Sequence, residues 1–192
     1  MDRRSFLNMA LAAVPALAVA QEQGSKPEPK IEPKQDAGKS GGAVVVAAGK
    51  DRYGMERPRP FGTSAFKVAT QDSGGDMFVM EHRLTVKGGP PLHLHHGEDE
   101  LFYIMEGDFL FEIGGRRFKA GPGDSVLGPK GIPHTWAFVG NTPGKMLFVF
   151  APAGKMEDFF AERDRRGGGL VEDAAFLKKY GMELLGPRLK IE

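Results

Sequence analysis

The central part of the chain consists of short apolar runs separated by glycine and proline. In residues 77–86, Phe78, Met80 and Leu84 fall on one face of an extended chain together with His82, and charged side chains fall on the other. This alternation predicts a strand with one buried face. Similar runs predict strands at 66–69, 101–106, 109–113, 116–119, 125–127, 134–139 and 145–151, and the run 43–48 is a candidate first strand.

The segments around these strands indicate how the chain is organised. Residues 21–42 are rich in Lys, Glu, Pro, Gly and Ser and predict a disordered linker. Gly114-Gly115, between two predicted strands, is a strong signal for a two-residue hairpin. After Pro152, residues 155–165 and 172–180 carry apolar side chains among many charges, as amphipathic helices do. The pattern predicts an all-β sandwich or barrel with short C-terminal helices over one end of the sheets.

Residues 1–20 have the features of an export signal. Arg3 and Arg4 precede a run rich in Ala, Leu and Val, and Ala18-Val19-Ala20 is a small-residue cleavage pattern. Because Phe6-Leu7 follows the two arginines, the segment resembles a twin-arginine signal. An ordinary secretory signal with two arginines is the alternative. Either signal predicts a periplasmic or secreted protein.

Composition restricts the chemistry and the partners. The chain has no cysteine, so thiolate ligands, cysteine catalysis and disulfides are excluded. It holds 26 basic and 25 acidic residues, and removal of Asp2, Arg3 and Arg4 with the signal makes it formally neutral. This balance does not favour binding to nucleic acid or to an anionic membrane. The apolar run of the signal is too short to span a bilayer, so we expect no integral membrane segment after signal removal.

Three histidines and a glutamate form a candidate metal site. His93 and His95 are two residues apart, so both imidazoles point the same way from an extended strand. The polar run 96–99 can turn the chain and bring Glu100 to the same side. His134 would complete a mixed nitrogen and oxygen set. Such a set suits one divalent transition metal, namely iron, manganese, nickel, cobalt or zinc, and leaves coordination positions for a substrate.

The polar residues beside these ligands have less specific interpretations. His96 follows His95 directly and should point to the opposite face, where exposure to solvent is the expected outcome. Glu98 and Asp99 could guide a second metal or a substrate, but a solvated turn is the better prediction.

Four further residues are candidates for a pocket at the metal. Trp136 and Phe138 share the face of His134 on a regular strand, and Phe102 shares the face of Glu100. His82 lies on an apolar face that could look into the same space. Ordinary barrel core, with a hydrogen-bonded histidine, is the alternative for each of them.

The spacing of these residues resembles two motifs of the cupin superfamily, specifically of the small single-domain cupins grouped with quercetin dioxygenases. In the first motif, His93-Leu94-His95 is followed after four residues by Glu100 and after six more by Gly107. In the second, Gly123 is followed after five residues by Pro129-Lys130-Gly131 and after two more by His134. Lys87 replaces the glycine that usually opens the first motif, and Phe138 replaces a frequent asparagine of the second.

The resemblance implies a jelly-roll β-barrel over residues 43–153 with a helical extension over 154–192. It also implies that His93, His95, Glu100 and His134 are metal ligands and that the activity is that of a dioxygenase on a small aromatic or enol-type substrate. Glu100 is then either a ligand that also accepts a substrate proton or a purely structural ligand. A non-catalytic binding protein for a small ligand and a metal-dependent isomerase or lyase are the alternatives.

Small cupins commonly form homodimers through their sheet edges. The segment 146–150 is apolar on both faces and could lie in such a contact. Burial between two sheets explains this segment equally well.

Overall fold

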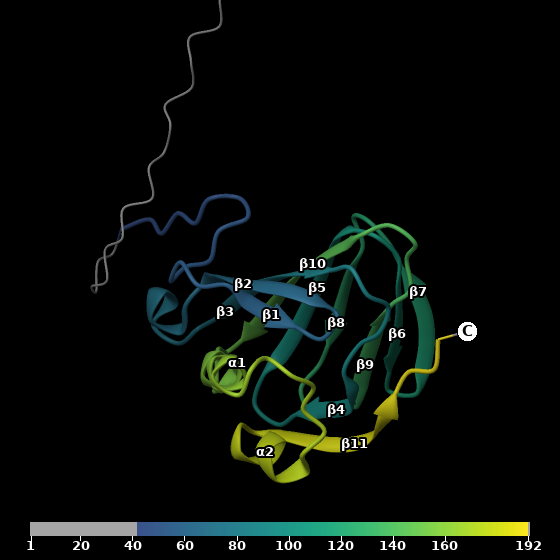
Figure 1. Ribbon diagram of the computed structural model, residues 1–192. Helices are drawn as coiled ribbons and strands as arrows, with labels where there is room; N and C mark the ends of the chain where they lie inside the picture. The colour runs from purple at the N-terminus through teal and green to yellow at the C-terminus, as the bar shows by residue number, and fades with distance from the viewer. Residues whose placement is uncertain (1–41, 192) are drawn as a thin grey trace, which may run out of the picture. The chain divides into compact units, whose positions relative to one another are not determined.

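The computed structural model describes residues 42–191. The predicted signal 1–20 and the linker up to residue 41 lie outside the described residues. The described part is an all-β fold in which two antiparallel sheets face each other, with two short helices at one end (Figure 1). The all-β jelly-roll prediction is therefore confirmed. No helix within residues 42–191 has the length and apolar character that crossing a membrane requires.

The first sheet has six strands in the order β1-β2-β3-β10-β5-β8. Their bounds are β1 Arg57–Arg59, β2 Gly62–Val68, β3 Phe78–Leu84, β10 Gly144–Ala151, β5 Asp99–Glu106 and β8 Ser125–Gly128. The strand β10 is paired on both sides, to β3 and to β5, so the segment 146–150 does not lie at a sheet edge. Met146, Phe148 and Phe150 of this segment are buried between the sheets, whereas Leu147 and Val149 on its other face are only half-buried. Dimerisation stays a prediction.

The second sheet has five strands in the order β11-β4-β9-β6-β7. Their bounds are β11 Met182–Arg188, β4 Pro91–His95, β9 His134–Phe138, β6 Phe109–Ile113 and β7 Arg116–Ala120. The predicted hairpin joins β6 to β7, with Gly114 and Gly115 at positive φ values of 57° and 78° that glycine adopts without strain.

Two parts of the chain differ from the prediction. The run 43–48 forms no strand, and Val44 and Val45 in it are exposed. The extension 154–192 is not wholly helical: α1 (Met156–Arg165) and α2 (Ala174–Lys179) are followed by the strand β11, which pairs with β4. A short 3-10 helix, η1 (Thr70–Ser73), joins β2 to β3.

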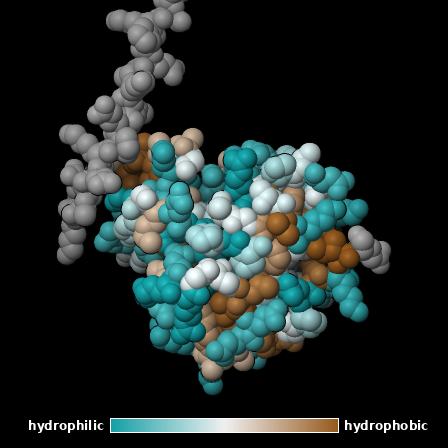
Figure 2. Space-filling model, in the orientation of Figure 1, coloured by the Kyte–Doolittle hydropathy of each residue, from teal (hydrophilic) through white to brown (hydrophobic). Residues whose placement is uncertain are grey.

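Aromatic side chains fill the space between the sheets. Seven phenylalanines are almost fully buried: Phe66, Phe78, Phe102, Phe109, Phe111, Phe138 and Phe150. Several of these rings meet edge to face, for example Phe66 and Phe78 with centroids 4.8 Å apart at 90°. Such pairs add to the hydrophobic stabilisation that follows from burial. On the face shown in Figure 2, apolar residues form separate patches between hydrophilic ones.

Buried ion pairs join the segment before β1, β1 itself and α1. The Arg57 guanidinium donates to Asp51 Oδ2 at 2.7 Å and to Asp164 of α1, and Arg59 donates to the same Asp164. The side chains of Arg57 and Asp51 are both only 2% exposed. Phe66 lies under the guanidinium of Arg57, 3.5 Å from ring centroid to Cζ, which adds a cation–π contact.

Loss of the Asp51 charge should destabilise the fold in a pH-dependent way. Burial raises the pKa of Asp51, but hydrogen bonds from Arg57 and from backbone N–H groups outweigh it and hold the pKa below its usual range. A carboxylate with a lowered pKa stabilises the folded state above the unfolded-state pKa of about 3.9, and this contribution is lost as the pH falls through the folded-state pKa. We expect Asp51→Asn to lower the free energy of unfolding by about 3 kcal/mol at pH 7.

Urea unfolding of wild type and variant at pH 7 and near pH 3 measures this effect. The difference between the two proteins should be large at pH 7 and should shrink in acid. Glu106→Gln, which removes an exposed ion pair with Lys145, should leave stability nearly unchanged at both pH values. An Asp51→Asn variant as stable as wild type at pH 7 would contradict the role of this network.

Candidate metal centre

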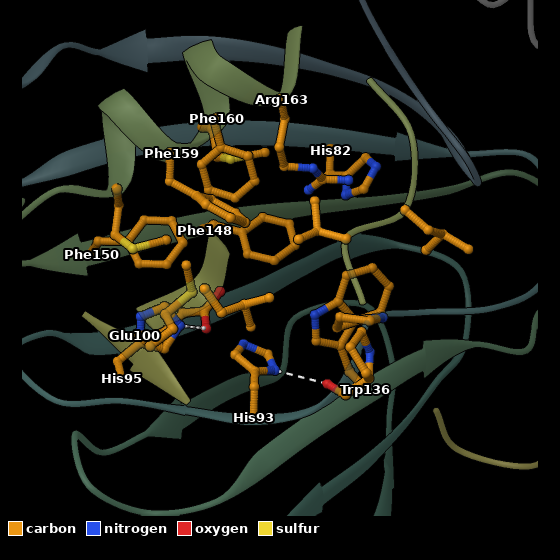
Figure 3. Close-up of a pocket in the computed structure, with 18 of the residues that line it drawn as sticks. His82, His93, His95, Glu100, Trp136, Phe148, Phe150, Phe159, Phe160 and Arg163 are labelled. Carbon is orange, nitrogen blue, oxygen red and sulfur yellow. Dashed lines mark hydrogen bonds and ion pairs between the residues drawn. The ribbon is translucent and has the colours of Figure 1, made fainter. Parts of the chain in front are cut away.

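Four side chains meet between the two sheets at one end of the barrel. His93 and His95 come from β4, Glu100 from β5 and His134 from β9, and one donor atom of each lies within 4.8 Å of all the others. All four residues are buried. Figure 3 shows His93, His95 and Glu100 together at one side of the pocket. The sequence-predicted ligands are thus brought to one place.

Strand register accounts for this convergence. The burial of β4 alternates so that His93 and His95 share its inner face, and His93 lies directly across from His134 of β9. A turn at residues 96–98 separates β4 from β5 and lets Glu100 point inward, as predicted. Gly128 pairs with Glu100, and a Cβ at this position would lie 3.3 Å from the His134 ring. The absence of a side chain there leaves room for that imidazole.

Backbone carbonyl groups orient two of the imidazoles. The Nδ1 atom of His93 lies 2.8 Å from the oxygen of Pro91, and that of His134 lies 2.9 Å from the oxygen of Ile132. A carbonyl oxygen only accepts, so Nδ1 carries the proton in both rings. The Nε2 lone pair of each ring is then free to ligate a metal, which is the usual arrangement of metal-binding histidines.

The donor set fits a cation. Glu100 Oε2 lies 3.0 Å from His134 Nε2 and 3.3 Å from His95 Nε2. Because Nδ1 of His134 donates to a carbonyl, a neutral ring would direct its Nε2 lone pair at the carboxylate, and this contact is favourable only when a proton or a metal ion lies between the two atoms. Three imidazole nitrogens and a carboxylate oxygen match iron, manganese, nickel, cobalt or zinc.

The pKa shifts follow from burial and from these contacts. Burial, and then the neighbouring His134 and His95, lower the pKa of His93 to about 3, so this ring is a neutral ligand at pH 7. Burial raises the pKa of Glu100, but hydrogen bonds from His134 and His95 outweigh it and hold the pKa below its usual range. For His95, burial lowers the pKa, yet Glu100 and Glu98 raise it to about 9 overall.

A cavity of about 90 Å³ is lined by three of the four ligands, His93, His95 and Glu100. Its walls are mainly apolar and come from both sheets and both helices, with Phe148, Phe150, Phe160 and Trp136 as large aromatic contributors. Figure 3 shows Phe148 between the metal ligands and a second polar group formed by His82 and Arg163. The ligands therefore face an aromatic chamber, and an ion bound by them would be reached through it.

Residues 80–150 match a family model described as a cupin domain. We therefore assign residues 80–150, the central part of the barrel, to the cupin superfamily. The match spans both histidine motifs, so the resemblance seen in the sequence is confirmed at the level of the superfamily.

Individual relatives are distant or partial. The chain is 34% identical over 67 residues to an uncharacterized protein of Methanocaldococcus jannaschii, and the match covers 35% of this chain and 54% of that relative. The chain thus spans about half the length of the curated relative it matches. Among solved structures, an RmlC-like cupin from Shewanella frigidimarina has 21% identity and a TM-score of 0.46, covering 55% of this chain and 87% of that one. A predicted oxalate decarboxylase from Thermotoga maritima has 24% identity and a TM-score of 0.45, covering 47% and 79%.

The cupin barrel places the four predicted pocket residues in two different environments. His82 and Trp136 line the cavity, with ring centroids 5.9 Å apart. Phe102 and Phe138 do not line it and belong to the barrel core. Phe102 packs against Phe111, whereas Phe138 contacts Phe109 and fills space left by glycines, since a Cβ on Gly144 would lie 2.7 Å from its ring.

Most of the cavity wall comes from residues that the sequence did not single out. Phe159, Phe160 and Arg163 come from α1, Leu177 from α2 and Met182 from β11. The apolar positions in 155–165 indicated an amphipathic helix, but only the fold shows that the helix packs over the metal end of the cupin barrel (Figure 1).

Glu98 is not in a solvated turn, contrary to the prediction. Its side chain is buried, and Oε2 lies 3.7 Å from His95 Nδ1, the ring nitrogen opposite the one that faces Glu100. Gly154, at φ 52°, has no side chain, and a Cβ there would overlap the Glu98 carboxylate. His96, by contrast, is exposed as predicted and lies 3.5 Å from the exposed Glu183.

We expect Glu98 to control the affinity of the site for metal. A carboxylate behind a metal-binding histidine fixes the ring and raises its basicity, and loss of such a partner typically costs 10- to 100-fold in affinity. Glu98→Gln should therefore weaken zinc binding by about 10- to 100-fold. Titration of metal-free protein in competition with a chelator measures this affinity.

Glu183→Gln provides the matched control. Glu183 pairs with His96 at 3.5 Å, a distance similar to the 3.7 Å between Glu98 and His95, but the Glu183–His96 pair lies on the surface. The control should bind zinc as wild type does. Equal affinities for all three proteins would show that Glu98 has no influence on the metal ligands.

Proposed function

We propose that this protein is a metal-dependent dioxygenase that acts on a small aromatic or enol-type molecule. The observation that supports this most directly is the juxtaposition of a buried three-histidine, one-glutamate group with an aromatic-walled cavity. A site of this kind combines open coordination positions with walls that suit a planar organic ligand. The cupin assignment makes enzymatic activity plausible but does not by itself select a reaction.

The ligands have distinct parts in this proposal. His93, His95, Glu100 and His134 would hold a divalent transition metal. When bound, the metal would supply Lewis acidity toward an enol or phenol oxygen and, if redox-active, reactivity toward dioxygen. Glu100 is the one ligand that can also accept a proton, and its carboxylate lies among the residues that line the cavity. It is therefore the residue that we propose to take the hydroxyl proton of the substrate.

The cavity walls supply orientation and exclude water. Phe148 lies against Trp136 and Phe150, with ring centroids 5.7 Å and 6.5 Å apart, so a flat ligand would contact aromatic faces or edges on several sides. Phe150 also lies beside His95, with centroids 5.7 Å apart, and extends this apolar surface to the metal ligands. Exclusion of water from such a site strengthens the interaction of the ion with an anionic substrate oxygen.

Oxygen uptake tests this proposal. Protein loaded anaerobically with Fe²⁺, Mn²⁺ or Ni²⁺ should consume dioxygen when supplied with at least one member of a panel of flavonols, catechols and stable enols. His134→Asn removes one ligand and should reduce uptake to background. His96→Asn changes an exposed histidine outside the site and should keep the wild-type rate.

The other outcomes separate the alternatives. A panel member that raises the melting temperature without oxygen uptake or chemical change would indicate a binding protein. Conversion of a panel member without oxygen consumption would indicate an isomerase or lyase. Either result, obtained with all three metals, would contradict the dioxygenase proposal.

We also propose that the protein is exported by the twin-arginine route. The support is the sequence Arg3-Arg4-Ser5-Phe6-Leu7 and the small-residue pattern that ends at Ala20. This route carries folded proteins, so metal could be acquired in the cytoplasm before copper or zinc competes for the site. Changing Arg3 and Arg4 to lysine should keep the charge but block export. Fractionation of cells that express both forms measures this, and undiminished export of the double variant would contradict the proposal.

A further inference from the structure

A second polar group lies at the end of the cavity away from the metal ligands. Arg163, from the last turn of α1, and His82, from β3, both line the cavity. Figure 3 shows the guanidinium of Arg163 beside the His82 ring, across the aromatic rings from His93, His95 and Glu100. The cavity therefore has two polar ends and an apolar middle.

Several polar atoms at this second end have no hydrogen-bond partner among the described residues. Arg163 Nε, His82 Nε2, Ser64 Oγ and the Nε and Nη2 atoms of Arg59 are all enclosed and unpaired. Ser64 lies directly across from His82 in the β2–β3 register. Enclosed donors without partners are costly and uncommon in folded proteins. Of these residues, Arg163 and His82 line the cavity, so a ligand in it can supply acceptors to their unpaired nitrogens.

The charge of this group points to an anion. Arg59 is paired with Asp164, whereas no carboxylate of the described part of the chain lies within ion-pair distance of Arg163. The hydrogen bond recorded for Arg163 joins Nη2 to the backbone oxygen of Gly169 at 3.1 Å. Burial and the neighbouring Arg59 lower the pKa of Arg163 to about 10, so it still carries its charge at pH 7.

His82 does not change the net charge at this end of the cavity. Burial, and then the charges of Arg59 and Arg163, lower its pKa to about 3, so the ring is neutral at pH 7 and can donate one hydrogen bond. The second end therefore has one positive charge without a carboxylate partner, beside a neutral histidine that can donate one hydrogen bond.

We propose that Arg163, with His82 beside it, binds the carboxylate of the substrate. The substrate is then a small planar organic acid, with its metal-binding oxygens at one end and its carboxylate at the other. This inference rests on the proposed function, because that function places the reacting oxygens at the four ligands. A guanidinium fork matches the two oxygens of a carboxylate, and a single unpaired arginine balances one negative charge better than the two of a phosphate monoester.

A purely structural role is the alternative for Arg163. Its guanidinium lies 5.6 Å from the ring centroids of both Phe159 and Phe160, and its bond to Gly169 fastens the segment after α1. On this alternative, replacing Arg163 would lower stability but would not change which ligands bind. Comparing the affinities for a charged and a neutral ligand therefore distinguishes a carboxylate-binding role of Arg163 from a purely structural one.

Tryptophan fluorescence provides the measurement. Trp136 is the only tryptophan of the chain and it lines the cavity, so its emission reports occupancy directly. The probes are 3,4-dihydroxybenzoate and 3,4-dihydroxybenzamide, which share a ring and a chelating diol and differ in the carboxylate charge. The protein is loaded with zinc, which has no redox chemistry, so binding is measured without turnover.

Wild type should bind the acid about 10- to 100-fold more tightly than the amide. Arg163→Gln keeps a donor for Gly169 but loses the charge, and it should bind the two probes about equally. Arg165→Gln, which changes an exposed arginine of the same helix, should keep the full preference. If Arg163→Gln does not fold, Arg163→Met serves as the second neutral variant, with the same expectation.

Equal binding of acid and amide by wild type, or an unchanged preference in a folded neutral Arg163 variant, would overturn the carboxylate site. The outcome is independent of the oxygen-uptake test. A preference for the acid without any oxygen consumption would leave this inference standing and would remove the dioxygenase. Oxygen uptake with neutral catechols, together with no preference for the acid, would support the dioxygenase proposal and overturn the carboxylate site.

Discussion

Three imidazoles and a carboxylate are held within 4.8 Å of one another inside an otherwise aromatic barrel, and the rest of the structure depends on this constraint. Such a group is unfavourable in an apolar interior unless a cation compensates it. The register that sets His93 across from His134, and the glycine at 128 that leaves space for the second ring, hold the donors in place without side-chain movement. The site is thus built into the pairing of the strands and not into a loop.

The aromatic surroundings make the ends of the cavity chemically distinct. Phe148 and Phe150 separate the metal ligands from Arg163, so the negative and positive groups do not neutralise each other directly. In a medium of low polarity, both ends interact strongly with a ligand of complementary charge. A ligand with a carboxylate and a chelating diol can satisfy both ends, whereas an apolar ligand leaves both without partners.

The parts of the site that sequence could predict are those whose positions depend on local geometry. His93 and His95 share a strand face because their spacing is two, and Glu100 joins them because a short polar turn follows. Glu98 was assigned wrongly because a charged residue in a turn is usually solvated, and its burial results from the distant Gly154. Phe138 was predicted to line the pocket, but Gly107, Gly140 and Gly144 make room for its ring in the core. Sequence adjacency carries no information about such contacts.

The sequence did not predict a role for Arg163, because its position also depends on residues that are distant in the sequence. Asp164 pairs with Arg57 and Arg59 and so fixes the last turn of α1 against β1. The preceding residue, Arg163, lies about 100° away around the helix axis and lines the cavity. Because the two residues are adjacent, the ion pairs that hold the helix also set the position of the guanidinium. The distance between the anion-binding end and the metal ligands therefore depends on the docking of α1, and the length of ligand that can bridge the two ends depends on it as well.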